Sequence, residues 1–324
     1  MNPEITLITP MFNESGCIKE NIKKIINSLQ SLGVSWEYIL INDGSTDDSY
    51  AIARECLAEY PNSKLIHYSQ NRGRGYALRQ GIDSATGKYV ITTESDLSWG
   101  GGVISDLYSA LKKRGDDIVI ASTHMPEGGY ENVPLFRRRL SSLGNRVIRH
   151  SFGGNVTMLS GMTRGYRRES IQSIYLEEDD KEIHLEIISK AQLLGWRVSE
   201  IPGRIQWSSE RKAKGFRKHL KIAKHIIPHL LTSISTGAFR IISVVCMLLL
   251  LTGTGLAVFG IFNKLFSLTS SPKPNIVTYG LLLVVLSIIT FLLSVLSLQL
   301  LSIKKGIVHL QSQIKRFQKE KTEK

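Results

Sequence analysis

The sequence predicts an α/β domain with a mostly parallel, mixed sheet, followed by two C-terminal transmembrane helices. Three observations predict this architecture. Residues 4–122 alternate short β-rich runs with helical patterns, two long uncharged apolar runs lie near the C-terminus, and the positive charge is confined to the C-terminal part. Alternation of strands and helices is typical of a parallel sheet covered by helices on both faces.

The predicted elements of the first domain follow one another in strict alternation. Strands are expected at Ile5–Thr9, Glu37–Ile41, Lys64–Tyr68, Tyr89–Thr93 and Asp117–Ala121. Helices are expected at Ser15–Leu32, Asp47–Tyr60, Gly75–Ala85 and Val103–Arg114. In such sheets ligands bind beyond the carboxyl ends of the strands. The site is therefore expected in the loops at that edge.

Polar clusters occupy three of these strand ends, at Thr9–Glu14, Asn42–Asp47 and Glu94–Leu97. Asn, Asp, Gly and Ser are also ordinary turn and helix-capping residues, so the second cluster alone is explained by a strand-to-helix connection. The pair Glu94 and Asp96 is more informative, because hard carboxylate oxygens suit Mg²⁺ or Mn²⁺ bridging a diphosphate. The sequence has no Gly-x-Gly-x-x-Gly or Walker pattern, which disfavours a nicotinamide fold and a P-loop NTPase.

Two apolar runs predict membrane spans. Ile241–Phe262 has 22 residues without a charge, and Ile276–Ile303 has 28 residues without a charge. At about 1.5 Å per residue each run is long enough to cross a hydrocarbon core of about 30 Å. Buried helices of a soluble protein are the alternative, and uncharged runs of this length disfavour it.

The charge distribution predicts the membrane topology. Residues 1–204 carry 24 Lys and Arg against 25 Asp and Glu, whereas residues 205–324 carry 17 against 3. Eight of these basic residues precede the first span within 205–240, and seven follow the second within 304–324. By the positive-inside rule the chain is expected to be a multi-pass membrane protein whose N-terminal domain and both termini are cytoplasmic. Attraction to anionic lipid explains the basic flanks better than a nucleic-acid partner does.

The order and spacing of the polar motifs resemble one enzyme family. The motifs are Pro10-x-Phe-Asn-Glu14, Asn42-Asp-Gly-Ser45, Asn71-Arg-Gly-Arg-Gly75, Ala85-Thr-Gly-Lys88, Glu94-Ser-Asp-Leu97, Ser160–Arg167 and Gly195–Pro202. Together they resemble the inverting glycosyltransferases of family two, which have the GT-A fold. With two C-terminal spans, the resemblance narrows to the polyprenyl-phosphate type, similar to dolichol-phosphate mannose synthase.

The resemblance implies roles for individual residues. The nucleotide sugar is expected to bind Pro10, Phe12, Asn13, Glu14, Asn42, Asp43, Ser45, Asn71, Arg74, Gly75 and Ser95. Glu94 and Asp96 are expected to ligate the Mg²⁺ or Mn²⁺ ion. Asp96, Arg137, Ser141 and Arg164 are expected to act in catalysis, with Arg137 and Ser141 on a helix over Leu135–His150 gripping the phosphate of a polyprenyl phosphate acceptor.

The chain departs from the family pattern at several positions. Asn42 and Glu94 stand where the family usually has Asp, Thr157 lies in the segment that commonly holds an Asp, and His124 stands in place of an Arg. Two alternatives follow: transfer to a glycolipid or polysaccharide, or a membrane adaptor that has lost its chemistry. Gln192–Trp196 resembles a motif of processive synthases, but Gly195 replaces its arginine and predicts a capped helix end.

The expected domain organisation has four parts. The glycosyltransferase domain spans 1–208, basic amphipathic helices span 209–240, two transmembrane helices span 241–303 (241–262 and 276–303), and a basic cytoplasmic tail spans 304–324. Three scattered cysteines indicate a reducing compartment. Related enzymes suggest a homo-oligomer, and Ile307, Leu310 and Ile314 lie at helical spacing in the tail, where they could pack against a neighbouring subunit.

Overall fold

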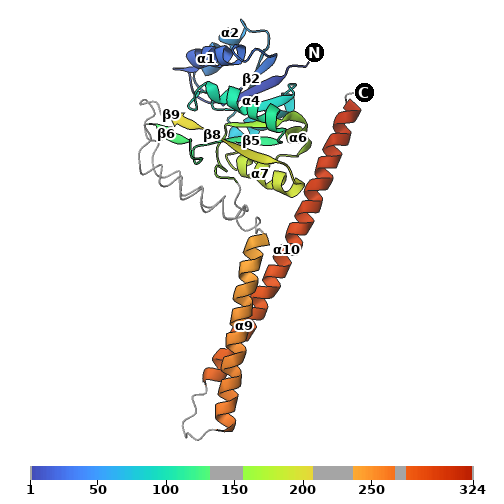
Figure 1. The fold of residues 1–324 in the computed structure, drawn as a ribbon. Coiled ribbons are helices and arrows are strands. Elements are labelled where there is room, and N and C mark those ends of the chain that lie inside the picture. The colour runs from blue at the N-terminus through green and yellow to red at the C-terminus, as the bar shows by residue number, and fades with distance from the viewer. Residues whose placement is uncertain (1, 132–155, 207–235, 267–274, 323–324) are drawn as a thin grey trace. The chain divides into compact units, whose positions relative to one another are not determined.

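The computed structural model describes residues 2–131, 156–206, 236–266 and 275–322 (Figure 1). Its first elements are β1 (Ile5–Met11), α1 (Ile18–Gln30), β2 (Trp36–Asp43), α2 (Ser49–Leu57), β3 (Ser63–Tyr68), α3 (Arg74–Ser84), β4 (Tyr89–Thr92), α4 (Gly102–Arg114) and β5 (Ile118–Ser122). There follow β6 (Gly129–Glu131), β7 (Arg164–Arg167), α6 (Arg168–Ser173), α7 (Ile183–Leu194), β8 (Val198–Pro202), β9 (Arg204–Gln206), α9 (Thr236–Leu265) and α10 (Asn275–Thr322).

The central sheet has seven strands in the order β3-β2-β1-β4-β7-β5-β8. Every pairing in it is parallel except those of β7, which runs antiparallel to both β4 and β5. The predicted mostly parallel, mixed sheet is therefore confirmed. A separate two-stranded sheet of β6 and β9, which the sequence analysis did not predict, lies after β5 and β8.

The helices cover the sheet because each has one apolar face. In α1 the buried positions recur every three or four residues, at Ile18, Ile22, Ile25, Ile26 and Leu29. This helix packs against α2 and α4, whereas α3 packs on β1 and β2 and contacts α6. The close approach of α3 to the sheet depends on Gly81, since a Cβ there would lie 2.6 Å from the Ile8 side chain.

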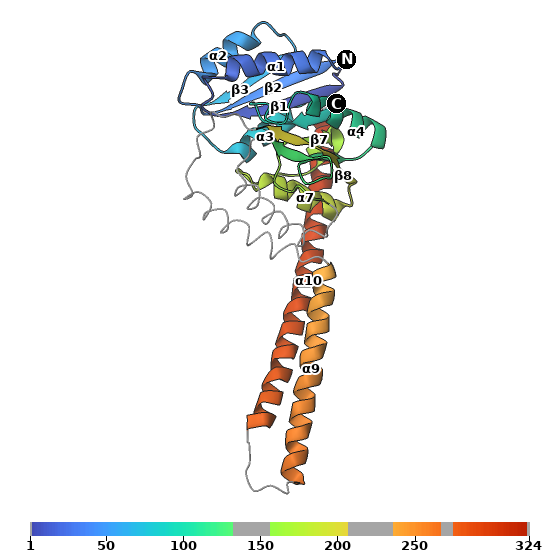
Figure 2. The ribbon, with the colours of Figure 1, turned by 60° about the vertical axis from the view of Figure 1, so that its left-hand side comes forward.

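A second compact unit contains α9 and the N-terminal part of α10, residues 236–266 and 275–306. Both helices are long and apolar enough to cross a membrane, over Val244–Asn263 and within Ile276–Lys315. They lie side by side in Figures 1 and 2, where Gly253 and Gly280 bring the two backbones close. Ser287 Oγ donates to the Cys246 carbonyl at 2.7 Å, which adds a polar contact between the two helices.

The last helix is longer than the predicted span. It continues without a break to Thr322, so residues 304–322 of the expected tail are helical. Residues 307–324 belong to the same compact unit as the sheet domain. The basic amphipathic segment expected before the first span falls almost entirely within residues 207–235, outside the described part of the chain.

Candidate active site

The expected site lies at one edge of the sheet, where β1, β2 and β4 end. Met11 of β1 pairs with Asn42 of β2, and Ile8 pairs with Thr92 of β4. The loops that follow these three strands therefore start side by side, as expected from the topology. Asn13 and Leu97 lie in these loops with left-handed φ angles of 55° and 47°. Such backbone is unfavourable for leucine and gathers at functional sites.

Hydrogen bonds around Asn13 join the loop after β1 to the loop after β2. The Asn13 amide donates to Ser45 Oγ at 3.0 Å, and Asn13 Oδ1 accepts from the Thr46 amide at 2.8 Å. The next residue continues the contact, because the Glu14 amide donates to Ser49 Oγ at 2.7 Å. Asn13 and Ser45, both expected to bind the donor, are thus brought into direct contact.

Two further side chains of the loop after β1 are Phe12, which is exposed, and Glu14, which contacts the loop after β4. Phe12 is 44% exposed, so part of this aromatic side chain is open to a ligand. Glu14 accepts a hydrogen bond from Ser95 Oγ, which links the loop after β1 to the loop after β4. Pro10 is half-buried at the end of β1. The structure therefore gathers Pro10, Phe12, Glu14 and Ser95 at the same edge.

Asp47 organises the start of α2. Its carboxylate accepts hydrogen bonds from the amide and hydroxyl of Ser49 and from the amide of Ser15. Partial burial by itself raises the pKa of Asp47, but the bonds from Ser49 and Ser15 together outweigh burial and hold the pKa below its ordinary value. Asp47 is therefore charged at neutral pH and ties the loops after β1 and β2 together.

Asn42 replaces the usual aspartate, and its neighbours explain why an amide fits. Its Nδ2 donates to His67 Nδ1 at 2.8 Å, and its Oδ1 accepts from the Ser45 amide at 3.3 Å. His67 in turn stacks on Tyr50, with ring centroids 4.0 Å apart. The Asn42 amide thus donates with its nitrogen and accepts with its oxygen, whereas an ionised carboxylate can only accept.

Asp43 is buried and holds the loop that follows β3. It accepts hydrogen bonds from Tyr68 Oη at 2.9 Å, from Asn71 Nδ2 at 3.0 Å and from the Arg72 amide at 2.8 Å. Burial, together with the negative charge of Asp43, raises the pKa of Tyr68, so the phenol remains a donor. Both carboxylate oxygens of Asp43 are engaged within the protein, which assigns this residue a positioning task next to the predicted donor ligand Asn71.

The glycines of the 71–75 motif permit a close backbone contact. Gly73 has φ 96°, and a Cβ on Gly75 would lie 2.4 Å from the Glu178 carbonyl oxygen. The Gly75 amide donates to the Asp179 carbonyl at 2.7 Å. Arg74, another expected donor ligand, is half-buried at the first position of α3. Gly75 therefore acts through its backbone, which joins α3 to the segment before α7.

Glu94 and Asp96 both lie in the loop after β4, and both are partly exposed. Glu94 uses one oxygen, Oε2, to accept from Ser98 Oγ at 2.8 Å and from Trp99 Nε1 at 3.2 Å. Asp96 Oδ1 accepts from the Ser98 amide at 3.0 Å. These bonds fix the direction of both carboxylates. Glu94 Oε1 makes no hydrogen bond to any described residue.

The donor set of this loop fits Mg²⁺ or Mn²⁺. Within the described ranges no three His, Cys, Asp or Glu side chains converge as a metal site. A pair of carboxylates is nevertheless what Mg²⁺ commonly takes from a protein, with substrate phosphates and water supplying its other ligands. Glu94 and Asp96 would hold such an ion, which would neutralise charge on a departing diphosphate.

Arg164 lies in the core of the domain. Its side chain is 0% exposed, and it donates to the carbonyls of Gly161 at 2.7 Å, His184 at 3.1 Å and Leu159. Burial lowers its pKa, and the charge is compensated by these carbonyl dipoles. The side chain therefore holds segment 159–161 against α7. This placement fits a positioning role and departs from the expected direct role in catalysis.

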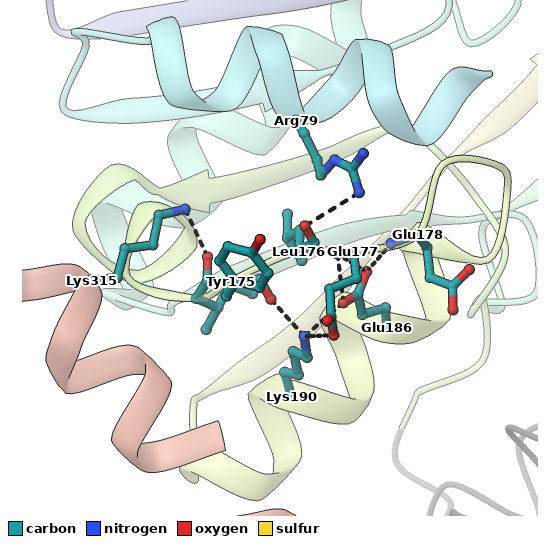
Figure 3. A network of polar contacts seen from close by, with 9 residues as sticks. Arg79, Tyr175, Leu176, Glu177, Glu178, Glu186, Lys190 and Lys315 are labelled. Atoms are coloured by element: carbon teal, nitrogen blue, oxygen red, sulfur yellow. Dashed lines mark hydrogen bonds and ion pairs between the residues drawn. The ribbon is translucent and has the colours of Figure 1, made fainter. Parts of the chain in front are cut away.

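Two glutamates that the sequence analysis did not select, buried Glu186 and half-buried Glu200, also hold backbone in place. Glu186 accepts from the amides of Glu177 and Glu178 at 3.0 Å and pairs with Lys190 at 2.7 Å (Figure 3). Glu200 accepts from the Thr157 amide at 2.8 Å and from the Met158 amide at 2.8 Å. In the sequence, Glu186 and Lys190 lie four residues apart, which is the spacing of an ion pair on one face of a helix. This spacing is the one sequence signal that could have identified Glu186.

The expected acceptor residues Arg137 and Ser141 lie in 132–155, outside the described residues, and so does the helix expected over Leu135–His150. Of the other departures from the family pattern, Thr157 Oγ1 donates to Glu200 at 2.8 Å. The amide of His124 donates to Ser122 Oγ at 3.2 Å. Both residues therefore take part in hydrogen bonds that hold the chain after β5 in place.

Comparison with known proteins gives relatives over most of the chain. An undecaprenyl-phosphate 4-deoxy-4-formamido-L-arabinose transferase of Shewanella sediminis is 26% identical over 265 residues, which are 81% of this chain and 74% of that protein. A dolichol-phosphate mannosyltransferase of Pyrococcus furiosus is 29% identical over 217 residues, which are 65% of this chain and 60% of that protein.

Solved structures share the fold. The glucosyl-3-phosphoglycerate synthase of Mycobacterium tuberculosis, solved with Mn²⁺ and uridine diphosphate, has a TM-score of 0.55 at 17% identity, over 72% of this chain and 80% of that one. The mannosyltransferase PcManGT of Pyrobaculum calidifontis, solved with GDP-Man and Mn²⁺, has a TM-score of 0.50 at 16% identity, over 92% and 75%. These likenesses confirm the expected GT-A fold.

The family model described as glycosyl transferase family 2 matches residues 6–175, which include every described residue of the three strand-end loops. The match covers more than half of the chain. The protein is a glycosyltransferase and belongs to glycosyl transferase family 2.

Proposed function

We propose that the protein transfers one sugar from a nucleotide diphosphate sugar, a UDP- or GDP-sugar, to a polyprenyl phosphate at the cytoplasmic face of a membrane. The observation that carries this proposal is the pairing of the three strand-end loops with two apolar helices in one chain. The relatives named for polyprenyl-phosphate sugar transfer, which align with 65–81% of the chain, support the acceptor class.

The reaction follows from the chemistry of the acceptor. An oxygen of the lipid phosphate attacks the anomeric carbon of the sugar, and the bond from that carbon to the diphosphate breaks on the opposite side, which inverts the configuration. A phosphate monoester is already ionised at neutral pH, so the attack requires no protein base to remove a proton. A sugar hydroxyl acceptor would require one.

The expected site residues divide into two groups. The donor nucleotide lies against the loops that begin at Pro10, Asn42 and Asn71, with Phe12 and Arg74 in reach of its base or phosphates. Glu94 and Asp96 would hold the divalent ion, Mg²⁺ or Mn²⁺. On the acceptor side, Arg137 and Ser141 bind the lipid phosphate, as the family resemblance implies.

The membrane arrangement is part of the same proposal. Residues 1–208 form the catalytic domain, 209–240 lie along the interface, 241–262 and 276–303 cross the membrane, and 304–324 return to the cytoplasm. The basic flanks on both sides of the span pair support this orientation. The protein works as a homo-oligomer.

The test uses membranes from cells that express the full chain. They are supplied with UDP- and GDP-sugars labelled in the sugar, with Mg²⁺ or Mn²⁺, and then extracted for lipid. We expect label in a lipid that releases its sugar in mild acid, and loss of that product with Asp96→Asn. Label in an acid-stable glycan would assign a different acceptor. Donor binding by calorimetry without transfer of any sugar would overturn the enzymatic proposal.

A further inference from the structure

The segment that joins α6 to α7, residues 174–179, is held by side chains of three helices. It has no regular secondary structure, so its backbone carbonyls need partners from elsewhere in the fold. Three consecutive carbonyls each accept a hydrogen bond from a basic side chain of a different helix (Figure 3). From α10, α7 and α3 in turn, these pairs are Ile174 with Lys315 at 3.0 Å, Tyr175 with Lys190 at 2.6 Å and Leu176 with Arg79 at 3.3 Å. The position of this segment therefore depends on all three helices.

The other end of the segment contacts the predicted donor loop. The Asp179 carbonyl accepts from the Gly75 amide at 2.7 Å and from the Tyr76 amide at 3.1 Å. The Asp179 carboxylate pairs with Arg79, so both its backbone and its side chain are tied to α3. Arg74, the expected donor ligand, directly precedes Gly75 in the chain. A shift of this segment would therefore move the loop that presents Arg74.

Lys315 joins the C-terminal part of α10 to both parts of this arrangement. Besides the Ile174 carbonyl, its Nζ contacts Asp83 Oδ1, in the last turn of α3, at 3.2 Å. Val308 and Ser312 lie at helical spacing from Lys315 on the same face and are each 5% exposed, so this face of the helix is covered. This part of α10 belongs to the same compact unit as the sheet domain. One ammonium group thus connects α10 to α3 and to the start of the segment before α7.

The contacts of Lys315 are suited to positioning rather than to holding the fold together. Its side chain is 29% exposed and that of Asp83 is 56% exposed, and an ion pair this open to water contributes little to stability. A cavity of about 400 Å³ lies beside it, lined by residues of α3, by Tyr175–Glu177 and by Lys315. Since packing leaves this space open, the distance between α10 and α3 depends here on the polar contacts of Lys315.

We propose that Lys315 is a positioning residue for the nucleotide sugar. By holding the start of the 174–179 segment and the last turn of α3, it fixes, through Asp179, the loop that presents Arg74 to the donor. The C-terminal part of α10 then contributes to donor binding without touching the donor. The inference rests on the proposed function, in which the loop over residues 71–75 binds the nucleotide sugar.

Hydrogen–deuterium exchange of the full-length protein in detergent tests the structural link. Lys315→Gln removes the ammonium, and Gln313→Glu is the matched control, because it changes the net charge by the same amount at an exposed position nearby. We expect the amides of Gly75 and Tyr76 to exchange about three- to tenfold faster with Lys315→Gln, and at the parent rate with Gln313→Glu. Equal rates in Lys315→Gln and in the parent would overturn the proposal.

The consequence for the donor is measured as the Kd for UDP or GDP with Mn²⁺, by calorimetry, together with the KM values for both substrates. We expect Lys315→Gln to raise that Kd and the KM for the nucleotide sugar about three- to tenfold. The KM for polyprenyl phosphate and the midpoint of thermal unfolding should stay near those of the parent. A lower midpoint of thermal unfolding with an unchanged Kd would show a merely structural role and overturn the proposal.

Reversal of the two charges tests the contact itself. Lys315→Glu places a carboxylate against Asp83 and the Ile174 carbonyl, so we expect a larger rise in the Kd than with Lys315→Gln. Addition of Asp83→Lys restores an ion pair and an ammonium beside the same carbonyl, and the double variant should recover most of the nucleotide binding. A double variant that binds no better than Lys315→Glu alone would overturn the proposal.

The failure of this proposal is distinguishable from the failure of the proposed function. If the parent chain neither binds UDP or GDP nor labels lipid, the proposed function fails, and donor positioning by Lys315 fails with it. If the parent binds nucleotide and labels lipid but Lys315→Gln keeps the parent Kd, only the positioning role of Lys315 is overturned.

Discussion

The loop after β4 and the segment around α7 use carboxylates in opposite ways. Glu186 in α7 is 6% exposed, accepts from two backbone amides and pairs with Lys190. Glu94 after β4 is partly exposed and, among the described residues, only its Oε2 accepts hydrogen bonds. A carboxylate whose oxygens are all engaged within the protein stabilises the fold. A carboxylate held in a fixed direction with an oxygen to spare is suited to a ligand.

The aspartates in the loops after β2 and β4 differ in burial, because Asp43 is buried and Asp96 is partly exposed. Asp43 is 5% exposed and is saturated by Tyr68, Asn71 and Arg72, although it lies in a motif that the family uses for the donor. Asp96 lies in the loop that also contains the left-handed residue Leu97. Position in a motif therefore does not by itself separate ligand-binding carboxylates from positioning ones.

The strongest test of this difference is Asp96→Asn. We expect transfer to fall roughly a thousandfold, about 4 kcal/mol, because a charged metal ligand is lost where charge develops on the leaving diphosphate. Thermal unfolding should be nearly unchanged. Asp106→Asn, on the exposed face of α4, is the matched control and should keep full activity. Near-normal transfer by Asp96→Asn would show that this carboxylate does not hold the ion.

Glu186→Gln should give the opposite pattern. The substitution leaves the buried Lys190 ammonium with only the exposed Glu177 carboxylate, 3.5 Å away, and the Tyr175 carbonyl. Breaking a fully buried pair costs about 3–5 kcal/mol, which is the upper bound here. We expect a lower midpoint of thermal unfolding, while the KM for the nucleotide sugar in the remaining folded protein changes little. A large rise in that KM at unchanged stability would place Glu186 on the side of the ligand-binding carboxylates.

Arg137→Ala tests the proposed binding of the lipid phosphate by Arg137. A charge-assisted hydrogen bond is worth about 1.5–3 kcal/mol, so the KM for polyprenyl phosphate should rise on the order of ten- to a hundredfold. Arg137→Lys should recover part of the loss, because a point charge lacks the guanidinium fork. Arg138→Ala and Arg139→Ala are the controls. Equal losses at the three arginines would indicate a general basic surface.

The buried side chain of His184 in α7 predicts that the stability of the protein depends on pH. His184 is 1% exposed, and its ring nitrogens have no hydrogen-bond partner among the described residues. Burial, with nearby Arg164, Arg74 and Lys181, lowers its pKa well below the ordinary value. The unfolded chain therefore takes up a proton below about pH 6.5 that the folded chain does not, and stability should fall by up to about 1.4 kcal/mol per pH unit.

His184→Leu should remove this part of the slope between about pH 7 and 5, as measured by thermal unfolding at a series of pH values. His309→Gln, at an exposed position of α10, serves as the control and should keep the slope of the parent. A slope that is the same in all three proteins would mean that His184 does not titrate with unfolding.

Glu94→Asp is the mildest change. It retains the charge and restores the family's usual residue, but the shorter side chain loses reach to Ser98 and Trp99. We expect a change in transfer rate of less than about tenfold, in either direction, with the preference between Mg²⁺ and Mn²⁺ altered. A loss as large as that of Asp96→Asn would show that the exact reach of Glu94 is essential to the site.

Much of the fold could be predicted because its signals are local. The βα order, the three loops at one sheet edge and the two apolar helices follow from runs of a few residues and from the rule that parallel strands share their carboxyl edge. The predicted helix end at Gly195 is confirmed by its left-handed φ of 71°. Local patterns also predicted that Asn13, Ser45 and Asp96 would belong to neighbouring loops.

What the sequence alone determined is thus the order of the elements and the edge at which the site forms. Only the tertiary structure decided which polar residues remain open to a ligand, since that depends on partners far apart in the chain. Glu200 meets Thr157 across 43 positions, Asp43 meets Asn71 across 28, and β7 enters the sheet antiparallel between β4 and β5. Burial then turns such groups inward, because an unpaired polar group in the core is costly and each must find its partner there.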